Sequence, residues 1–344
     1  MQESSVEPLK FYVECLDLDG ALKAAKELRL LPEHSSYLID FSKLSWFEPF
    51  GMLYFARQLR DFADSRKPAT CQAVGHEKHG YAAYMGFFRT FGLEFGNEVG
   101  EAPGSSAYIP ITELKIRELH LEAGQSQREV QEIIEMRCAK LATVLARNAN
   151  GALHETLTYS LREILRNVTE HSNADSIWYA AQYWPSKNLV ELSILDQGLG
   201  IRATLSRNPH LAISNDADAL RLALLPGVSG RAFKGGPTLR KDEWANSGYG
   251  LYMTSQICSN GGSFTICSGE EGLIFSKGIE RKLEVGFSGT AIRLCIYVPE
   301  VKSLNEAFSQ FNELARTIDQ RVPEPSRLTA SMSSRMLSDH FPRD

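Results

Sequence analysis

Segments of strand length alternate with segments of helix length over the first hundred residues of this chain. The strand patterns lie at 9–16, 37–41 and 70–74, and the helical patterns lie at 19–31 and 49–66. Asp19 is the expected N-cap of the first helix, Pro32 ends it, and Pro49 fits the first turn of the second. This β-α-β-α-β order predicts an α/β fold in which helices pack on a sheet.

A stretch rich in Gly and turn residues, 92–104, separates this region from the remainder of the 344 residues. The expected organisation is a first domain at 7–104, a second at 108–300, an amphipathic helix at 301–321 and a flexible tail at 322–344. In the second domain, strand patterns lie at 108–119, 176–181, 189–195, 263–268 and 290–298. Helical patterns lie at 126–148, 153–171 and 250–259, and 201–247 is long, Gly-rich and irregular. Ser126 with Glu129 forms a capping-box pattern at the start of the first of these helices.

Composition narrows the class of protein. Hydrophobic residues make up 43% and charged residues 23%, which is typical of a globular chain and argues against disorder as the dominant state. The net charge of -5 argues against general nucleic-acid binding, and no apolar run reaches the roughly 18 residues that a membrane span needs. The six cysteines contain no CxxC pair, which predicts buried, reduced thiols in a cytoplasmic protein.

One polar strip lies along the helical pattern at 153–171. Glu163, Asn167 and His171 are spaced four residues apart, so they share one strip at the edge of the apolar face. A carboxylate and an amide placed there can activate a water and ligate a hard cation. The alternative is a solvated helix face that carries an isolated Asn.

A glycine-rich turn follows the strand pattern at 189–195. Asp196 can accept a hydrogen bond from an exocyclic amine, and Gly198 and Gly200 allow a ligand to approach the backbone closely. One alternative is a plain turn. Another is a dinucleotide fingerprint at 198–203, whose acidic partner would be Asp216 or Asp218, although no strand pattern precedes them.

A second glycine-rich segment opens the helical pattern at 250–259. It reads Ser247-Gly248-Tyr249-Gly250-Leu251, and glycines before a helix N-terminus expose amide N–H groups that suit phosphate. The preceding loop carries the basic residues Arg231, Lys234, Arg240 and Lys241. The alternative is a solvated charged loop.

These motifs, taken in order, resemble those of the GHKL ATPase superfamily, which includes gyrase, heat-shock chaperones of the ninety-kilodalton class and histidine kinases. Glu163 and Asn167 match the N box, the Asp196 turn matches the G1 box, and the Gly248 segment matches the G2 box. Gly289-Thr290 before the last strand completes the set. The resemblance implies a Bergerat-type α/β sandwich that binds ATP under a mobile lid, here residues 201–247.

The resemblance also implies a role for each matching residue. Glu163 would be the catalytic base, Asn167 would hold Mg²⁺, Asp196 would bind the adenine amine, and Thr290 would support it through water. The nucleotide-binding set implied for ATP is Asp196, Gly198, Gly200, Lys234, Ser247, Gly248, Tyr249, Gly250, Leu251 and Thr290.

The segment 38–52 in the first domain resembles the central stretch of STAS domains, the fold of anti-sigma-factor antagonists. That family's acceptor serine corresponds to Phe50, and Pro49 replaces its neighbour, so neither position offers a hydroxyl. Ser42 and Ser45 lie nearby, but nothing singles them out. The resemblance therefore implies a sensor or docking module that is not phosphorylated.

Three functional hypotheses follow. The first is an ATP- and Mg²⁺-dependent regulatory switch that contacts protein partners through the STAS-like domain or the lid. The second is an anti-sigma-type serine/threonine kinase that acts on a separate protein, and the third is a module that binds nucleotide without turnover. The apolar face of the helix at 126–148 either packs within its domain or forms a homodimer, and His154 is expected to be a packing residue rather than a phosphoacceptor.

Overall fold

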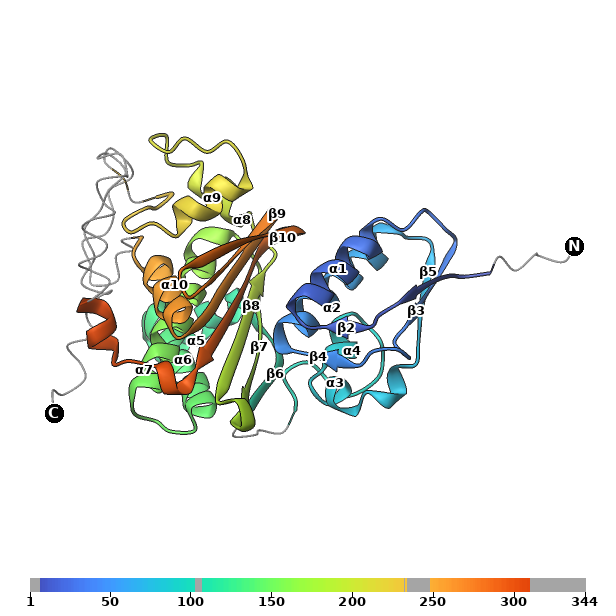
Figure 1. The fold of residues 1–344 in the computed structure, drawn as a ribbon, viewed down its shortest axis with the longest axis horizontal. Coiled ribbons are helices and arrows are strands. Elements are labelled where there is room, and N and C mark those ends of the chain that lie inside the picture. Colours follow the sequence, from blue (N-terminus) through green and yellow to red (C-terminus); the bar gives the residue numbers. More distant parts are fainter. Residues whose placement is uncertain (1–6, 103–106, 232, 234–247, 310–344) are drawn as a thin grey trace, which may run out of the picture. The chain divides into compact units, whose positions relative to one another are not determined.

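The computed structural model describes residues 7–102, 107–231, 233 and 248–309. The chain divides into two compact units. The first contains Met1–Ser105, Ile109–Glu113 and Trp178–Ala181, and the second contains Ser106–Tyr108, Leu114–Ile177 and Gln182–Asp344. Strands and helices alternate through the described residues, which confirms the expected α/β class (Figure 1).

Parallel strands form the sheet of the first unit, in the order β1-β3-β5. Its elements are β1 (Leu9–Tyr12), β2 (Cys15–Leu16), α1 (Leu18–Arg29), β3 (Ser36–Asp40), β4 (Trp46–Phe47), α2 (Pro49–Ser65), β5 (Thr70–Val74), α3 (Gly80–Tyr84) and α4 (Phe87–Thr90). The expected β-α-β-α-β order is confirmed. The short strands β2 and β4 pair separately, because the expected strand at 9–16 breaks after Tyr12.

The N-cap of α1 differs from the expected one. The side chain of Asp17, not Asp19, accepts the N–H of Gly20 at 2.8 Å, and Asp19 lies within the first turn. Both positions satisfy the helix N-terminus electrostatically, but only a residue with extended backbone before the helix can cap it. The sequence pattern could not separate two Asp residues two positions apart.

The start of α2 is packed tightly. Gly51 lies against the carbonyl of Leu16, where a Cβ would collide with the backbone. Phe50, which the resemblance to STAS domains matches to an acceptor serine, is buried and stacks on Tyr54 with ring centroids 5.4 Å apart. Ser42 and Ser45 are exposed. Phe50 is therefore a core residue, and its packing against Tyr54 accounts for an aromatic side chain at this position.

A five-stranded sheet with the order β6-β7-β8-β10-β9 lies beside helices α6, α7 and α10, which Figure 1 shows on one side of it. β10 is antiparallel to both β8 and β9. The elements are β6 (Tyr108–Lys115), α5 (Ile116–Ser126), α6 (Val130–Ala146), α7 (Ala152–Asn167), β7 (Ser176–Trp184), β8 (Leu189–Asp196), α8 (Gly200–Leu205), α9 (Asp216–Ala223), α10 (Gly250–Asn260), β9 (Gly262–Ser276) and β10 (Ile279–Tyr297). Residues 156–166 of α7 are buried on every side, so this helix lies at the centre of the layer.

The segment around Ser126 corrects the sequence prediction. The strand expected at 108–119 ends at Lys115, and the following residues form α5. Ser126 belongs to the last turn of α5, where its hydroxyl donates to the Glu122 carbonyl at 2.7 Å, and Gln127 adopts a left-handed conformation that ends the helix. The expected capping box is therefore wrong, because Ser126 is already bonded to the preceding turn.

The described part of 201–247 is more regular than expected, since it contains α8 and α9. Asn215 caps α9 by accepting the N–H of Asp218 at 2.9 Å. Arg221 on α9 donates to Glu280 on β10 at 3.0 Å, and Asp216 accepts the N–H of Glu270 on β9 at 2.9 Å. These bonds fasten α9 to the β9–β10 hairpin, so this part of the expected lid is anchored.

The C-terminal prediction is confirmed only in the described part. Residues 304–309 are helical and 301–303 are not, and the Ser303 hydroxyl accepts the N–H of Glu306 at 3.2 Å. The expected continuation at 310–321 and the tail at 322–344 lie outside the described residues.

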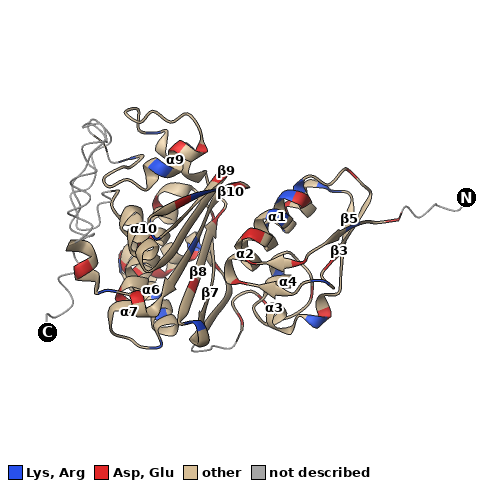
Figure 2. Ribbon diagram, viewed as in Figure 1, with Lys and Arg blue, Asp and Glu red and all other residues tan. Residues whose placement is uncertain are grey.

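Surface features of the described residues are mixed. α1 and α9 each carry both acidic and basic side chains (Figure 2).

Four of the cysteines are buried, but Cys15 is only partly buried and Cys71 is exposed, so the expectation of six buried thiols is wrong for these two. Within 7–102, 107–231 and 248–309, no helix is both long and apolar enough to cross a bilayer.

Candidate functional site

One cavity brings together most of the residues that the motifs single out. It lies between α7, the end of β8, α8, the segment 226–230, the start of α10 and β10. The lining residues that the sequence predicted are Asn167, Asp196, Gly200, Gly248, Gly250, Leu251 and Thr290. These residues come from parts of the chain up to 123 positions apart (Asn167 to Thr290). The cavity volume is about 100 Å³.

Asp196 ends β8 and supplies a carboxylate to this cavity. Its side chain is 2% exposed, and it accepts the Gly198 N–H at 2.8 Å. Burial raises the pKa of Asp196 to about 6, and the Gly198 N–H opposes that rise. Thr290 is the cross-strand neighbour of Asp196 on β10. An acceptor with few hydrogen-bond partners thus faces a largely apolar space, where it can select a ligand that carries a donor.

The apolar part of the cavity wall is formed by side chains from α7 and the π-helical turn after it, α8, the loop after α9, α10, β8 and β10. Its aliphatic members are Ile164, Val168, Ile194, Leu195, Ile201, Leu205, Val228, Leu251 and Ile292. Such a surface suits the faces of a flat, apolar ring, and Asp196 is the acid among the lining residues.

Asn167 is the last residue of α7 and is half-buried in the cavity wall. The chain continues in a π-helical turn, Val168–Ser172, which also brings His171 into the wall. Burial and, to a smaller extent, the nearby Arg231 guanidinium lower the pKa of His171 to about 4. The predicted polar strip is therefore split: Asn167 and His171 line the cavity, whereas Glu163 does not.

Glu163 lies one turn earlier on α7 and is 8% exposed. Its Oε1 accepts from Nε and Nη2 of Arg162 at 3.1 and 2.8 Å, and Arg162 is itself 1% exposed. Its Oε2 lies beside Gly250 at the start of α10, where a Cβ would collide with the carboxylate. Glycine at position 250 therefore leaves space for the Glu163 carboxylate. Gly250 itself lines the cavity, so Glu163 lies directly behind the cavity wall.

The segment before α10 reaches the cavity through its glycines. Gly248 has φ of +72°, and a Cβ there would strike the Val228 carbonyl, so the turn requires glycine. Gly248, Gly250 and Leu251 line the cavity, whereas the Tyr249 side chain packs on the cluster around Tyr159 and Met253. Tyr249 is therefore not among the lining residues, and its role in nucleotide binding stays a prediction. Ser247 and Lys234 lie outside the described residues.

The geometry decides two of the alternatives weighed from sequence, the dinucleotide fingerprint and the role of His154. A dinucleotide fingerprint needs an acid at the end of the next strand of a parallel unit. Here β8 pairs antiparallel with β10, and Asp216 lies in the first turn of α9, so that alternative is wrong. His154 is buried, with its Nε2 at 3.2 Å from both the Thr143 hydroxyl and the Ala139 carbonyl, as expected of a packing residue.

Several wall residues were not predicted from sequence, namely Ser172, Thr204, Ser229 and Gly230. They belong to the π-helical turn, α8 and the loop after α9, and no local pattern marks them because tertiary packing places them there. Within the described part of the chain, no three His, Cys, Asp or Glu side chains gather as a metal cluster. A hard cation would therefore rely on Asn167 together with oxygens of the ligand.

No protein-family model matches the sequence, and no curated protein is significantly similar to it. The fold and the cavity define the chain as a mixed α/β protein with a buried carboxylate and a helix N-terminus at one site.

Proposed function

We propose that this chain is a GHKL-type, Bergerat-fold protein that binds ATP and Mg²⁺ and uses nucleotide state to control protein interactions. One observation carries the proposal: each of the N, G1 and G2 boxes contributes at least one residue to the lining of a single cavity, which Thr290 also lines, although Glu163 and Gly198 do not. Convergence of four separate motifs is far more specific than any of them alone.

The adenine ring would occupy the apolar part of the cavity. Asp196 supplies the acceptor for the exocyclic amine, and its burial makes an unmatched ligand unfavourable. Thr290 lies across the strand pair from it and supports the same contact through water. Guanine carries a carbonyl oxygen where adenine carries its exocyclic amine, so it would offer the Asp196 carboxylate no donor there. The site should therefore prefer adenine over guanine.

The phosphates would lie at the other side of the cavity, toward α10. The amides at the start of this 11-residue helix and its dipole favour an anion. Asn167 supplies the amide oxygen for Mg²⁺, which would neutralise the phosphate charge when bound. The volume of 100 Å³ is below the roughly 300 Å³ of ordinary ligand pockets, so binding must displace part of the wall. The segment 226–230 is a buried part of this wall that lies outside any helix or strand.

Glu163 is the proposed base. An incoming water or hydroxyl oxygen forms a bond to the terminal phosphorus, the bond to the bridging oxygen breaks, and the proton of the nucleophile passes to the carboxylate. Arg162 holds Oε1, which leaves Oε2, beside Gly250, as the oxygen that receives the proton. The acceptor is water in the ATPase and a protein hydroxyl in the kinase alternative.

The STAS-like unit is proposed as the sensor or docking module. Its acceptor position is the buried Phe50, so phosphoryl transfer within the chain has no target there. Partners would therefore supply their own hydroxyl in the kinase alternative.

Incubation of the full chain with γ-labelled ATP and Mg²⁺, alone and with candidate partner proteins, separates these functions. We expect slow release of labelled phosphate by the chain alone. Label on a partner protein would instead favour the kinase alternative. Nucleotide binding with neither product would reject turnover and leave the non-hydrolysing module.

A further inference from the structure

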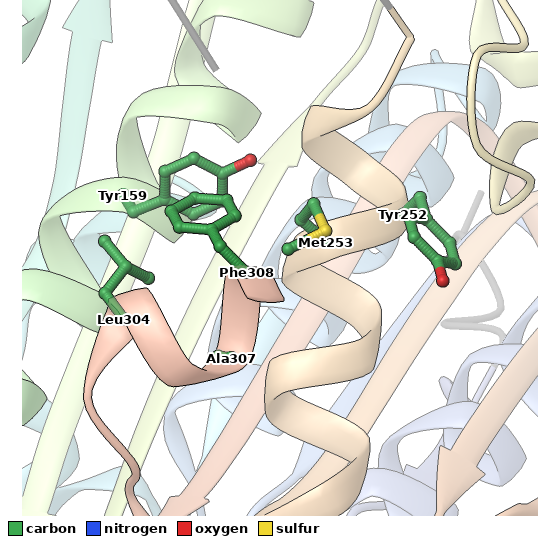
Figure 3. Packing of buried hydrophobic residues seen from close by; sticks show 6 residues of the cluster. All are labelled: Tyr159, Tyr252, Met253, Leu304, Ala307 and Phe308. Carbon is green, nitrogen blue, oxygen red and sulfur yellow. The ribbon is translucent and has the colours of Figure 1, made fainter. Parts of the chain in front are cut away.

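The short helix at 304–309 covers both helices that carry the proposed site. Leu304, Ala307 and Phe308 are buried in one cluster with Tyr159 of α7 and with Tyr252 and Met253 of α10. Figure 3 shows the Phe308 ring directly against Tyr159, with Met253 nearby on α10. The helix therefore packs where α7 and α10 meet, one turn from Glu163 and from Gly250.

A continuous series of side chains leads from this helix to Glu163. The Phe308 and Tyr159 rings meet edge to face, with centroids 5.0 Å apart at 87°. The Arg162 guanidinium lies over the Tyr159 ring, 5.3 Å from its centroid. Arg162 in turn donates two hydrogen bonds to Oε1 of Glu163. Each link is an interaction with directional preference, so displacement of one member changes the geometry of the next.

The surroundings of this series favour a fixed geometry. Tyr159 and Arg162 are fully buried, and burial with the nearby Glu163 charge holds the pKa of Tyr159 well above its usual value. The phenol therefore stays neutral and presents a π face to the cation. A buried guanidinium is costly unless it is paired, so turning Arg162 away from Glu163 would remove part of the compensation for its burial.

We propose that helix 304–309 positions the base: Phe308 fixes Tyr159, Tyr159 fixes Arg162, and Arg162 fixes the carboxylate of Glu163 beside Gly250. The proposal rests on the function proposed for Glu163. Phe308, Tyr159 and Arg162 are positioning residues, since the base alone contacts the reacting atoms. Loss of the contact between Phe308 and Tyr159 should reduce the rate of the chemical step and spare nucleotide affinity, because none of the six cluster residues lines the cavity.

The test is Phe308→Ala in the full chain, with kcat for phosphate release and Kd for Mg·ATP measured separately. We expect kcat to fall roughly 10- to 100-fold, as for other displaced catalytic groups, while Kd changes by less than about twofold. Glu306→Ala changes an exposed residue of the same helix and should match the wild type. Leu304→Ala removes apolar area from the same cluster but leaves both rings of the Tyr159–Phe308 pair in place, and so controls for the loss of stability.

Three results would overturn the proposal. They are an unchanged kcat in Phe308→Ala, an equal loss of kcat in Leu304→Ala, and a Kd that rises in step with the fall in kcat. A wild-type chain that binds no ATP would instead reject the proposed function itself, so the two failures are distinguishable.

Discussion

Replacement of Glu163 with Gln should lower phosphate release by roughly 100- to 10,000-fold, the usual contribution of a general base. Affinity for Mg·ATP should be retained, because Glu163 lies outside the lining of the cavity. Gln is the appropriate change, since its carbonyl can still accept from Arg162 and leaves that buried cation partly satisfied. Single-turnover release of labelled phosphate measures the effect.

Glu155→Gln is the matched control for this variant. Glu155 lies in the first turn of the same helix and is only partly buried, so its substitution should leave the rate unchanged. If Glu163→Gln released phosphate as fast as the wild type, Glu163 would not be the base, and the match to the N box would not extend to catalysis.

Asp196→Asn should make the free protein more stable at neutral pH while weakening nucleotide binding. Burial raises the pKa of Asp196 from an ordinary 3.8 to about 6 in the folded chain. Between these values the folded state keeps a proton that the unfolded state releases, so stability from this group falls as pH rises through 6. The full difference is about 3 kcal/mol at roughly 1.4 kcal/mol per unit. Asn does not titrate, and its side-chain oxygen can still accept the Gly198 N–H.

Urea unfolding at several pH values measures this effect. The gain in unfolding free energy of Asp196→Asn over the wild type should be small near pH 4 and should grow to its full size above pH 6. Asp175→Asn, at an exposed position, serves as the control and should show no such trend. A gain that did not vary with pH would mean that the Asp196 carboxylate carries no burial penalty.

The affinity for ATP should fall in Asp196→Asn, although the stability of the free protein rises. The Asn side chain presents an NH₂ group as well as an oxygen, and it lacks the charge that strengthens the bond to the adenine amine. A residue that reduces stability yet improves ligand binding is typical of functional sites. Unchanged ATP affinity in Asp196→Asn would remove the proposed adenine contact.

The sequence predicted the fold best where a local pattern coincided with burial. The second helix, expected at 49–66, is observed as Pro49–Ser65, and the strand at 70–74 is observed at the expected bounds. Asn167, Asp196, Gly248 and Thr290 were each marked by a short motif, and the structure places all four around one cavity. Motifs of this kind constrain the backbone over a few residues, so they can be recognised from the sequence before the fold is known.

Features set by tertiary contact were missed. α5 has a weak local signal, and the hydroxyl of Ser126 bonds back to Glu122 rather than forward to a new helix. The pairing of Arg162 with Glu163 could not be foreseen, because adjacent residues on a helix usually diverge and only burial forces these two together. The wall segment 226–230 and the contact of Phe308 with Tyr159 depend on chain segments that are distant in sequence.

Thermal unfolding of the full chain with Mg·ATP tests most directly whether the cavity is a nucleotide site. At a hundredfold excess over Kd, a ligand that binds only the folded state adds about 2.7 kcal/mol. For a unit of about 200 residues this raises Tm by roughly 5–10 °C. Mg·GTP and inorganic tripolyphosphate serve as controls for the base and the phosphates, and both should give much smaller shifts. An unchanged Tm with Mg·ATP, or an equal shift with tripolyphosphate, would contradict adenine recognition by Asp196 in this cavity.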